Sequence, residues 1–161
     1  MSEMSEMSVR WAAIGFACAT AYNSAVAIRE DLPGEPLGVR VPISVSTGIL
    51  TGWGSCVAAP WPMPVLALLA VRRLSHAGAG NKPAYVCAAL GAAGLVGILI
   101  EPNTYRAGNW TRRTRRAVHL HVGTCAVLVG TGLRHARRAE PPPRGYSHQV
   151  SECGYLPRRP R

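Results

Sequence analysis

Aspartate, lysine and phenylalanine are nearly absent from this sequence, where each occurs once, as Asp31, Lys82 and Phe16. A single aspartate excludes the paired acidic motif that holds magnesium on a diphosphate. The chain also lacks a glycine-rich phosphate loop, a Gly-x-Ser-x-Gly elbow and a His-Glu-x-x-His motif. These absences argue against ATP-driven transport and against prenyltransferases with Asp-rich motifs. The basic residues are not interleaved with stacking aromatics, so nucleic acid is not an expected partner.

Close cysteine pairs are absent as well, although the chain has five cysteines. No two of them have the Cys-x-x-Cys spacing of a metal or redox motif. Four of them, Cys18, Cys56, Cys87 and Cys125, fall one in each apolar run. We therefore interpret them as small buried hydrophobic residues that pack between helices, and we expect no metal and no cofactor.

Charge is scarce, since 16% of the residues are charged and 48% are hydrophobic, yet the net charge is +10. This combination with long apolar runs is typical of membrane proteins. Arginines beside the runs are expected to contact anionic lipid headgroups. Abundant Ala, Gly, Pro and Arg with one lysine indicates a high-GC bacterial genome.

The apolar runs predict an all-α fold, a transmembrane four-helix bundle with a Pro-broken second span, multi-pass in the cell membrane. The predicted spans are about 11–28, 44–71 (kinked), 83–100 and 118–133. They form one domain, 11–138, between a disordered tail at 1–10 and a disordered Pro/Arg-rich tail at 139–161.

Small residues recur every four positions and predict faces for close helix contact in lipid. The faces are Gly15–Ala19–Asn23–Ala27, Gly48–Gly52 and Ala89–Ala93–Gly97.

The second span has three possible arrangements. Three prolines at alternate positions, Pro60, Pro62 and Pro64, make an unbroken helix unlikely to form there. The run could be a span over 44–59 followed by an interfacial segment, one kinked and tilted span, or a short re-entrant piece. We favour a sharply kinked span that ends near Val71.

The stretch from Ile100 to His121 carries most of the concentrated polar chemistry. His119 and His121 lie about 200° apart around a helix, so they cannot chelate one ion together. His119 shares a face with the small residues Gly123, Ala126 and Gly130, and we predict it as the inward histidine. His121 shares the other face with Cys125, Leu128 and Gly132.

Glu101 and His119 are the candidate catalytic residues. In a four-span bundle, the polar residues at several span ends meet at one end of the bundle. The candidate substrate contacts there are Tyr22, Asn23, Ser46, Asn103 and Arg106, and Ser44 is expected nearby. Glu101 has two interpretations. It forms a salt bridge with Arg106 or with the cluster Arg112–Arg116, or it forms an acid/base pair with His119 that faces a lipophilic substrate.

A short motif occurs twice, as Glu35-Pro36-x-x-x-Arg40 and Glu101-Pro102-x-x-x-Arg106. Both copies join an odd span to the next even one, so we predict that they lie at the same end of the bundle. The repetition is consistent either with a duplicated helical hairpin or with chance.

The layout resembles the small uncharacterised four-span membrane proteins of high-GC bacteria, through Glu101-Pro102 after the third span and the basic loop before the fourth. It is similar, more weakly, to the anthrone-oxygenase-like membrane family. That resemblance rests on Asn103, Trp110 and Arg112–Arg116. It implies a small four-spanning fold.

Two functional hypotheses follow. The first is a non-catalytic partner or assembly subunit that binds a copy of itself or another membrane protein through its small-residue faces. The second is a membrane-embedded cyclase, isomerase or oxygenase that acts on a lipophilic polyketide or isoprenoid. A transporter is disfavoured because four short spans enclose little pathway.

Overall fold

The computed structural model describes residues 2–39, 41–76, 80–105, 108 and 110–139. Within these ranges the protein is all-helical, with five α-helices, two short 3₁₀-helices and no strand. The α-helices are α1 (Ser2–Arg29), α2 (Val45–Thr51), α3 (Pro62–Leu74), α4 (Lys82–Leu99) and α5 (Arg112–Ala139), and the 3₁₀-helices are η1 (Pro36–Gly38) and η2 (Pro102–Tyr105). The C-terminal tail at 140–161, Arg40 and Arg106 lie outside the described residues.

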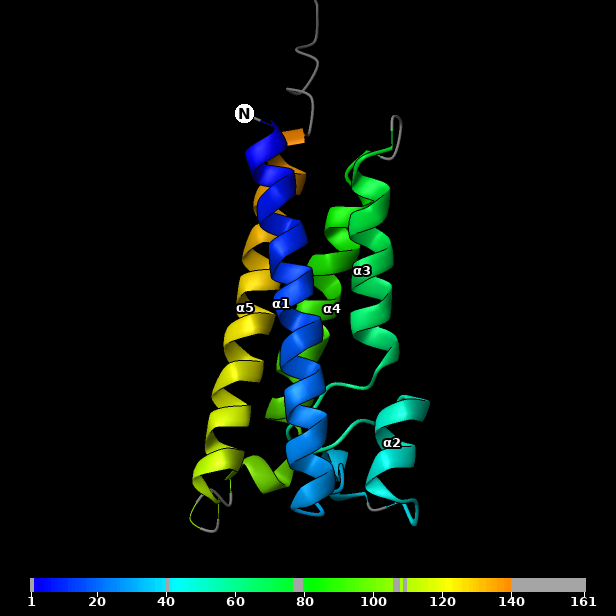
Figure 1. The fold of residues 1–161 in the computed structure, drawn as a ribbon, viewed down its shortest axis with the longest axis vertical. Coiled ribbons are helices and arrows are strands. Elements are labelled where there is room, and N and C mark those ends of the chain that lie inside the picture. The colour runs from blue at the N-terminus through cyan, green and yellow to red at the C-terminus, as the bar shows by residue number, and fades with distance from the viewer. Residues whose placement is uncertain (1, 40, 77–79, 106–107, 109, 140–161) are drawn as a thin grey trace, which may run out of the picture.

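Four helices, α1, α3, α4 and α5, lie side by side along the long axis of the molecule (Figure 1). α1 and α5 are antiparallel, because Ser5 hydrogen-bonds His135 near one end and Glu30 accepts from Thr111 at the other. The short helix α2 lies below α3 in Figure 1, at the end of the bundle where α1 and α4 finish. Together α2 and α3 therefore occupy the place of one helix of the bundle.

α4 and α5 approach each other closely at two glycines. A Cβ atom added to Gly132 would lie 2.7 Å from the Ala84 carbonyl oxygen. A Cβ atom added to Gly91 would lie 2.7 Å from the Cys125 carbonyl oxygen. Both positions require glycine because the two backbones touch there.

The second predicted span is broken rather than kinked. α2 begins where the Ser44 hydroxyl accepts the Thr47 N–H at 3.2 Å, and it ends at Gly52, whose φ is 109°. Residues 52–61 form an irregular segment, here called the break loop, and α3 starts at Pro62. The Trp61 N–H donates to the Ile49 carbonyl at 2.9 Å, so the loop folds back on α2. The prolines correctly indicated an interruption, but the interruption is a ten-residue loop and not a bend.

Three other expectations need correction. Residues 2–10, expected to be disordered, are the first turns of α1, where Val9 is fully buried and Arg10 pairs with Glu6 at 2.6 Å. The Gly48–Gly52 face is not a helix contact, because Gly52 ends α2 and is exposed. The buried face of α4 is not Ala89–Ala93–Gly97, which is exposed; it is Ala84, Cys87, Ala88, Gly91, Gly94 and Ile98.

One expectation about a helix face is confirmed, and one predicted boundary needs correction. On α1, Ala19, Asn23 and Ala27 are buried, as the four-residue spacing predicted. The fourth predicted span begins earlier than Val118, because the Thr111 hydroxyl accepts the Thr114 N–H at 3.1 Å and caps α5. Two helical segments, Glu3–Arg29 and Lys82–Leu99, are long and apolar enough to cross a membrane.

Candidate functional site

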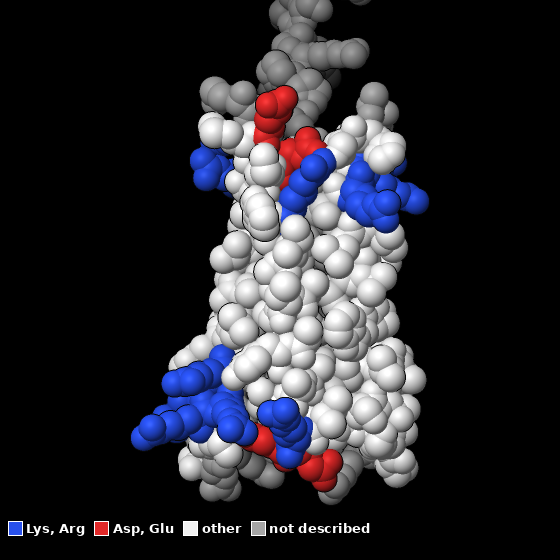
Figure 2. Space-filling view, viewed as in Figure 1, with Lys and Arg blue, Asp and Glu red and all other residues white. Residues whose placement is uncertain are grey.

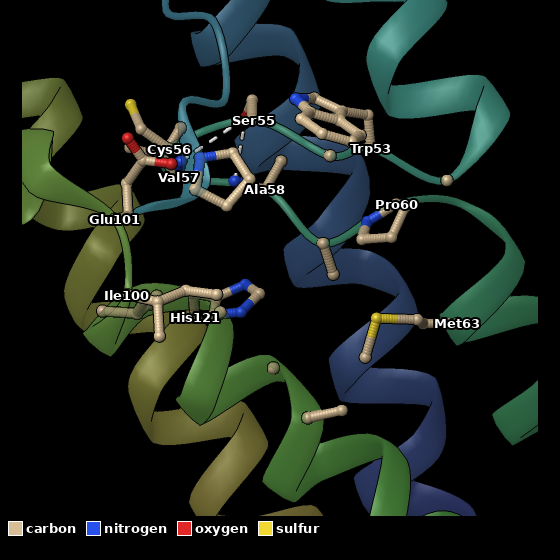
Figure 3. A pocket seen from close by; sticks show the side chains of 18 residues that line it. Trp53, Ser55, Cys56, Val57, Ala58, Pro60, Met63, Ile100, Glu101 and His121 are labelled. Atoms are coloured by element: carbon tan, nitrogen blue, oxygen red, sulfur yellow. Dashed lines mark hydrogen bonds between the residues drawn. The ribbon is translucent and has the colours of Figure 1, made fainter. Parts of the chain in front are cut away.

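A cavity of about 170 Å³ lies between the break loop, the end of α4 and α5 (Figure 3). Its walls are mostly apolar, and the ionisable side chains on them are Glu101, His121 and Cys56. Each of these three residues is at most 5% exposed. The cavity therefore gathers buried polar chemistry from three segments that are far apart in the sequence.

Glu101 joins the two Glu-Pro turns. Its Oε2 accepts the Glu35 N–H at 3.0 Å and its Oε1 accepts from the Asn103 Nδ2 at 3.2 Å. The Leu37 N–H donates to the Ile100 carbonyl at 2.9 Å, which adds a second bond between the turns. The prediction that both turns lie at the same end of the bundle is confirmed by these contacts.

The environment of Glu101 differs from one of the two salt bridges predicted for it. No arginine of the cluster Arg112–Arg116 forms an ion pair with it in the described part of the chain, and Arg106 lies outside that part. Burial raises the pKa of the Glu101 carboxyl above its ordinary value, and the hydrogen bonds from Glu35 and Asn103 oppose that rise. The carboxyl group is therefore held as a hydrogen-bond acceptor between two turns.

The inward histidine is His121, and the prediction of His119 is wrong. His121 is 3% exposed, whereas His119 is exposed on the outer side of α5. The grouping of His121 with Cys125, Leu128 and Gly132 on one face was correct. That face turns inward because Gly132 must meet the backbone of α4 and Cys125 packs against Gly94.

The His121 ring projects from α5 below the break loop in Figure 3. The Phe16 ring meets it edge-on, with 6.2 Å between the ring centroids. Nδ1 of the ring is buried and has no hydrogen-bond partner among the described residues. A neutral imidazole has one nitrogen that donates and one that accepts, so the ring can offer an acceptor to a molecule in the cavity.

The predicted substrate contacts do not gather around this cavity. Tyr22 and Ser46 are exposed, and Asn103 contacts Glu101 without lining the cavity. Asn23 is fully buried on α1, and neither atom of its amide has a partner, but it is not a lining residue. Arg106 lies outside the described residues.

The break loop supplies the part of the site that the sequence interpretation missed. Trp53, Cys56 and Val57 line the cavity, together with Met63 at the start of α3. The Ser55 hydroxyl accepts the Ala58 N–H at 3.0 Å and helps to close the loop on itself. The available signal was the proline run, which predicted an irregular segment but not which side chains it would turn inward.

In the described ranges no group of three or more His, Cys, Asp or Glu side chains is arranged to hold a metal ion. In the part of the chain that the structure describes, the fold is all-helical, and a mostly apolar pocket with three buried ionisable side chains lies at an interrupted helix. No family model, curated protein or solved structure matches the chain.

Proposed function

We propose that this chain is a four-span membrane protein in which α1, α4, α5 and the broken pair α2–α3 are the spans. The observation that carries the proposal is the distribution of side-chain size. The core is built largely from Ala, Gly and Cys, whereas large apolar side chains point outward on every α-helix. Exposed examples are Ile14, Leu50, Leu66, Val86 and Val127. Lipid solvates such a surface, and water does not.

The charge distribution supports the same proposal. In Figure 2 the charged side chains gather at the two ends of the molecule, and the visible face between them is uncharged. Charge-free stretches run over 11–28 in α1, 83–99 in α4 and 117–133 in α5. At 1.5 Å per residue they are about 26 Å long, close to the thickness of a hydrocarbon core.

The break loop is compatible with a position inside the bilayer. Irregular backbone is tolerated at membrane depth only where protein or water surrounds it. Cys56, Val57, Ala58 and Ala59 are each at most 5% exposed, so the bundle covers this part of the loop. Interrupted helices of this kind are a common element of membrane proteins with internal sites.

The proposed role is that of a non-catalytic partner or assembly subunit in the cell membrane. Glu101 supports it, because its Oε2 accepts from Glu35 in the other turn and its Oε1 accepts from Asn103 in its own turn, so both oxygens are occupied by structural hydrogen bonds. The outer face of α5 also supports it, since a Cβ atom at Gly123 or Gly130 would meet nothing within 4 Å. Such open glycines allow another helix to approach closely, either from a second copy or from another membrane protein.

An embedded enzyme is the second candidate, favoured by the presence of Glu101 and His121 on one cavity. In this version His121 replaces His119 in the acid/base pair, and the substrate class remains a lipophilic polyketide or isoprenoid. Mass spectrometry of organic extracts from purified wild-type and Glu101→Gln protein tests it. A bound or converted molecule in the wild type alone would favour the enzyme over the subunit.

Cysteine labelling in intact cells tests the four-span topology. In a background without the native cysteines, we expect Leu37→Cys and Gly108→Cys to react from one side of the membrane with an impermeant maleimide. Ser75→Cys is expected to react only from the other side, because α3 ends at the opposite end of the bundle. Equal labelling of all three positions from one side would contradict a spanning bundle.

Association through the outer face of α5 has its own test. Gly130→Leu is expected to lower co-purification with a partner, or dimer formation, by at least about fivefold, which corresponds to roughly 1 kcal/mol. Thermal stability should not fall, because the added side chain meets open space within the protomer. Val86→Ala, which removes bulk from the exposed surface of a different helix, α4, is the control. Unchanged association in Gly130→Leu would show that the outer face of α5 is not the contact surface.

A further inference from the structure

The cavity beneath the break loop is lined by a buried histidine, His121, that has a ring nitrogen without a partner among the described residues. His121 is 97% buried, since its exposed fraction is 3%, and its Nδ1 has no partner. The ring lies on the cavity wall (Figure 3). A buried polar atom without a partner is costly, so this site calls for a hydrogen-bond donor from a molecule inside the cavity.

Two other polar side chains on the wall accept hydrogen bonds from their neighbours, whereas the Trp53 indole on the same wall donates its N–H to the Gly34 carbonyl at 3.0 Å. The Glu101 carboxylate accepts from Glu35 and Asn103, and the Ser55 hydroxyl accepts from Ala58. An anionic ligand would be repelled by the Glu101 carboxylate, and an unpaired ion of either sign is expensive to bury. The matching ligand is therefore neutral and carries a donor.

The size and lining of the cavity restrict the body of the ligand. Val57, Met63 and Ile98 provide apolar walls around a volume of about 170 Å³. An apolar cavity of about 150 Å³ in another protein takes up benzene. One six-membered ring therefore fits this space.

We propose that this cavity binds a neutral, hydroxylated six-membered ring, such as a phenol, whose O–H donates to the acceptor nitrogen of the His121 ring. Gly97 leaves the space open, because a Cβ atom there would meet nothing within 4 Å although the residue lines the cavity. The site needs no catalytic step. The binding proposal does not depend on the subunit role. The cysteine-labelling test of the four-span topology can fail while the ligand still binds.

The test uses the full chain in nanodiscs with ¹⁵N-labelled histidine. The probes are 4-fluorophenol and 4-fluoroanisole, which has the same ring but cannot donate. We expect a saturable shift of one acceptor-type ring-nitrogen resonance with the phenol, and that resonance should be missing from His121→Leu. By ¹⁹F relaxation the phenol should bind at least about fivefold tighter than the anisole, the effect of one net hydrogen bond.

Three variants locate the site. His121→Leu should abolish the preference for the phenol, whereas His119→Leu, on the outer face of the same helix, should retain it. Gly97→Val should remove binding of both probes with an unchanged circular dichroism spectrum, because the valine fills the cavity. Equal affinity for both probes, no saturable binding, or full binding by Gly97→Val would overturn the proposal. Tighter binding of 4-fluorobenzylamine would overturn the requirement for a neutral ligand.

Discussion

Replacing Gly132 by alanine is expected to lower the free energy of unfolding by about 1–3 kcal/mol, the usual cost of overpacking a well-packed contact. The new Cβ atom would lie 2.7 Å from the Ala84 carbonyl oxygen and 3.0 Å from the Ala88 nitrogen. Both are backbone atoms, so α4 and α5 must separate to make room. The measurement is unfolding in mixed SDS–detergent micelles, followed by far-UV circular dichroism.

Gly130→Ala is the matched control, because it makes the same chemical change two residues away on the same helix. Its Cβ atom would meet nothing within 4 Å. Alanine is favoured over glycine in a helix interior by up to about 1 kcal/mol, so this variant should be as stable as the wild type or more so. Equal losses in both variants would show that α4 and α5 do not meet at Gly132.

Replacing Glu101 by alanine is expected to cost about 2–4 kcal/mol, because the Glu35 N–H and the Asn103 side-chain amide both lose a buried acceptor. Glu101→Gln retains one acceptor oxygen and should cost less. The same unfolding assay measures both variants. A loss in Glu101→Ala no larger than about 0.5 kcal/mol would show that the carboxylate does not hold the two turns together.

The difference in the free energy of unfolding between the wild type and Glu101→Gln should depend on pH. Burial raises the pKa of Glu101 above the ordinary value of 4.5, so the folded protein keeps the proton to a higher pH than the unfolded chain does. Stability from this group is complete below pH 4.5 and is lost as the pH rises through the folded pKa. The advantage of the wild type over Glu101→Gln should therefore shrink as the pH is raised above 4.5. An advantage that grows over this range would mean that the folded pKa lies below 4.5.

The position of Glu101 was predictable in part. Because Glu101 follows an apolar run, the sequence placed it at one end of the bundle. The number of runs between the two Glu-Pro turns placed the turn at Glu35 at the same end. The bond from Glu35 could not be predicted, because it joins residues 66 positions apart through a backbone N–H that has no sequence signature.

The two histidines show a different limit. Helical periodicity alone separated His119 from His121 and placed His121 with Cys125 on one face. The rule that small residues face inward then selected the wrong face. Both faces of α5 carry glycine, and only the contact of Gly132 with α4 distinguishes them.

The sequence by itself determined that the chain is helical, that its charges fall between apolar runs and that prolines interrupt the second run, because these properties depend on neighbours within a few residues. Tertiary structure alone decided which face of α5 is buried, how the break loop folds back and which groups share the cavity. Those outcomes depend on backbone contacts between helices distant in the chain, and local periodicity carries no information about such contacts.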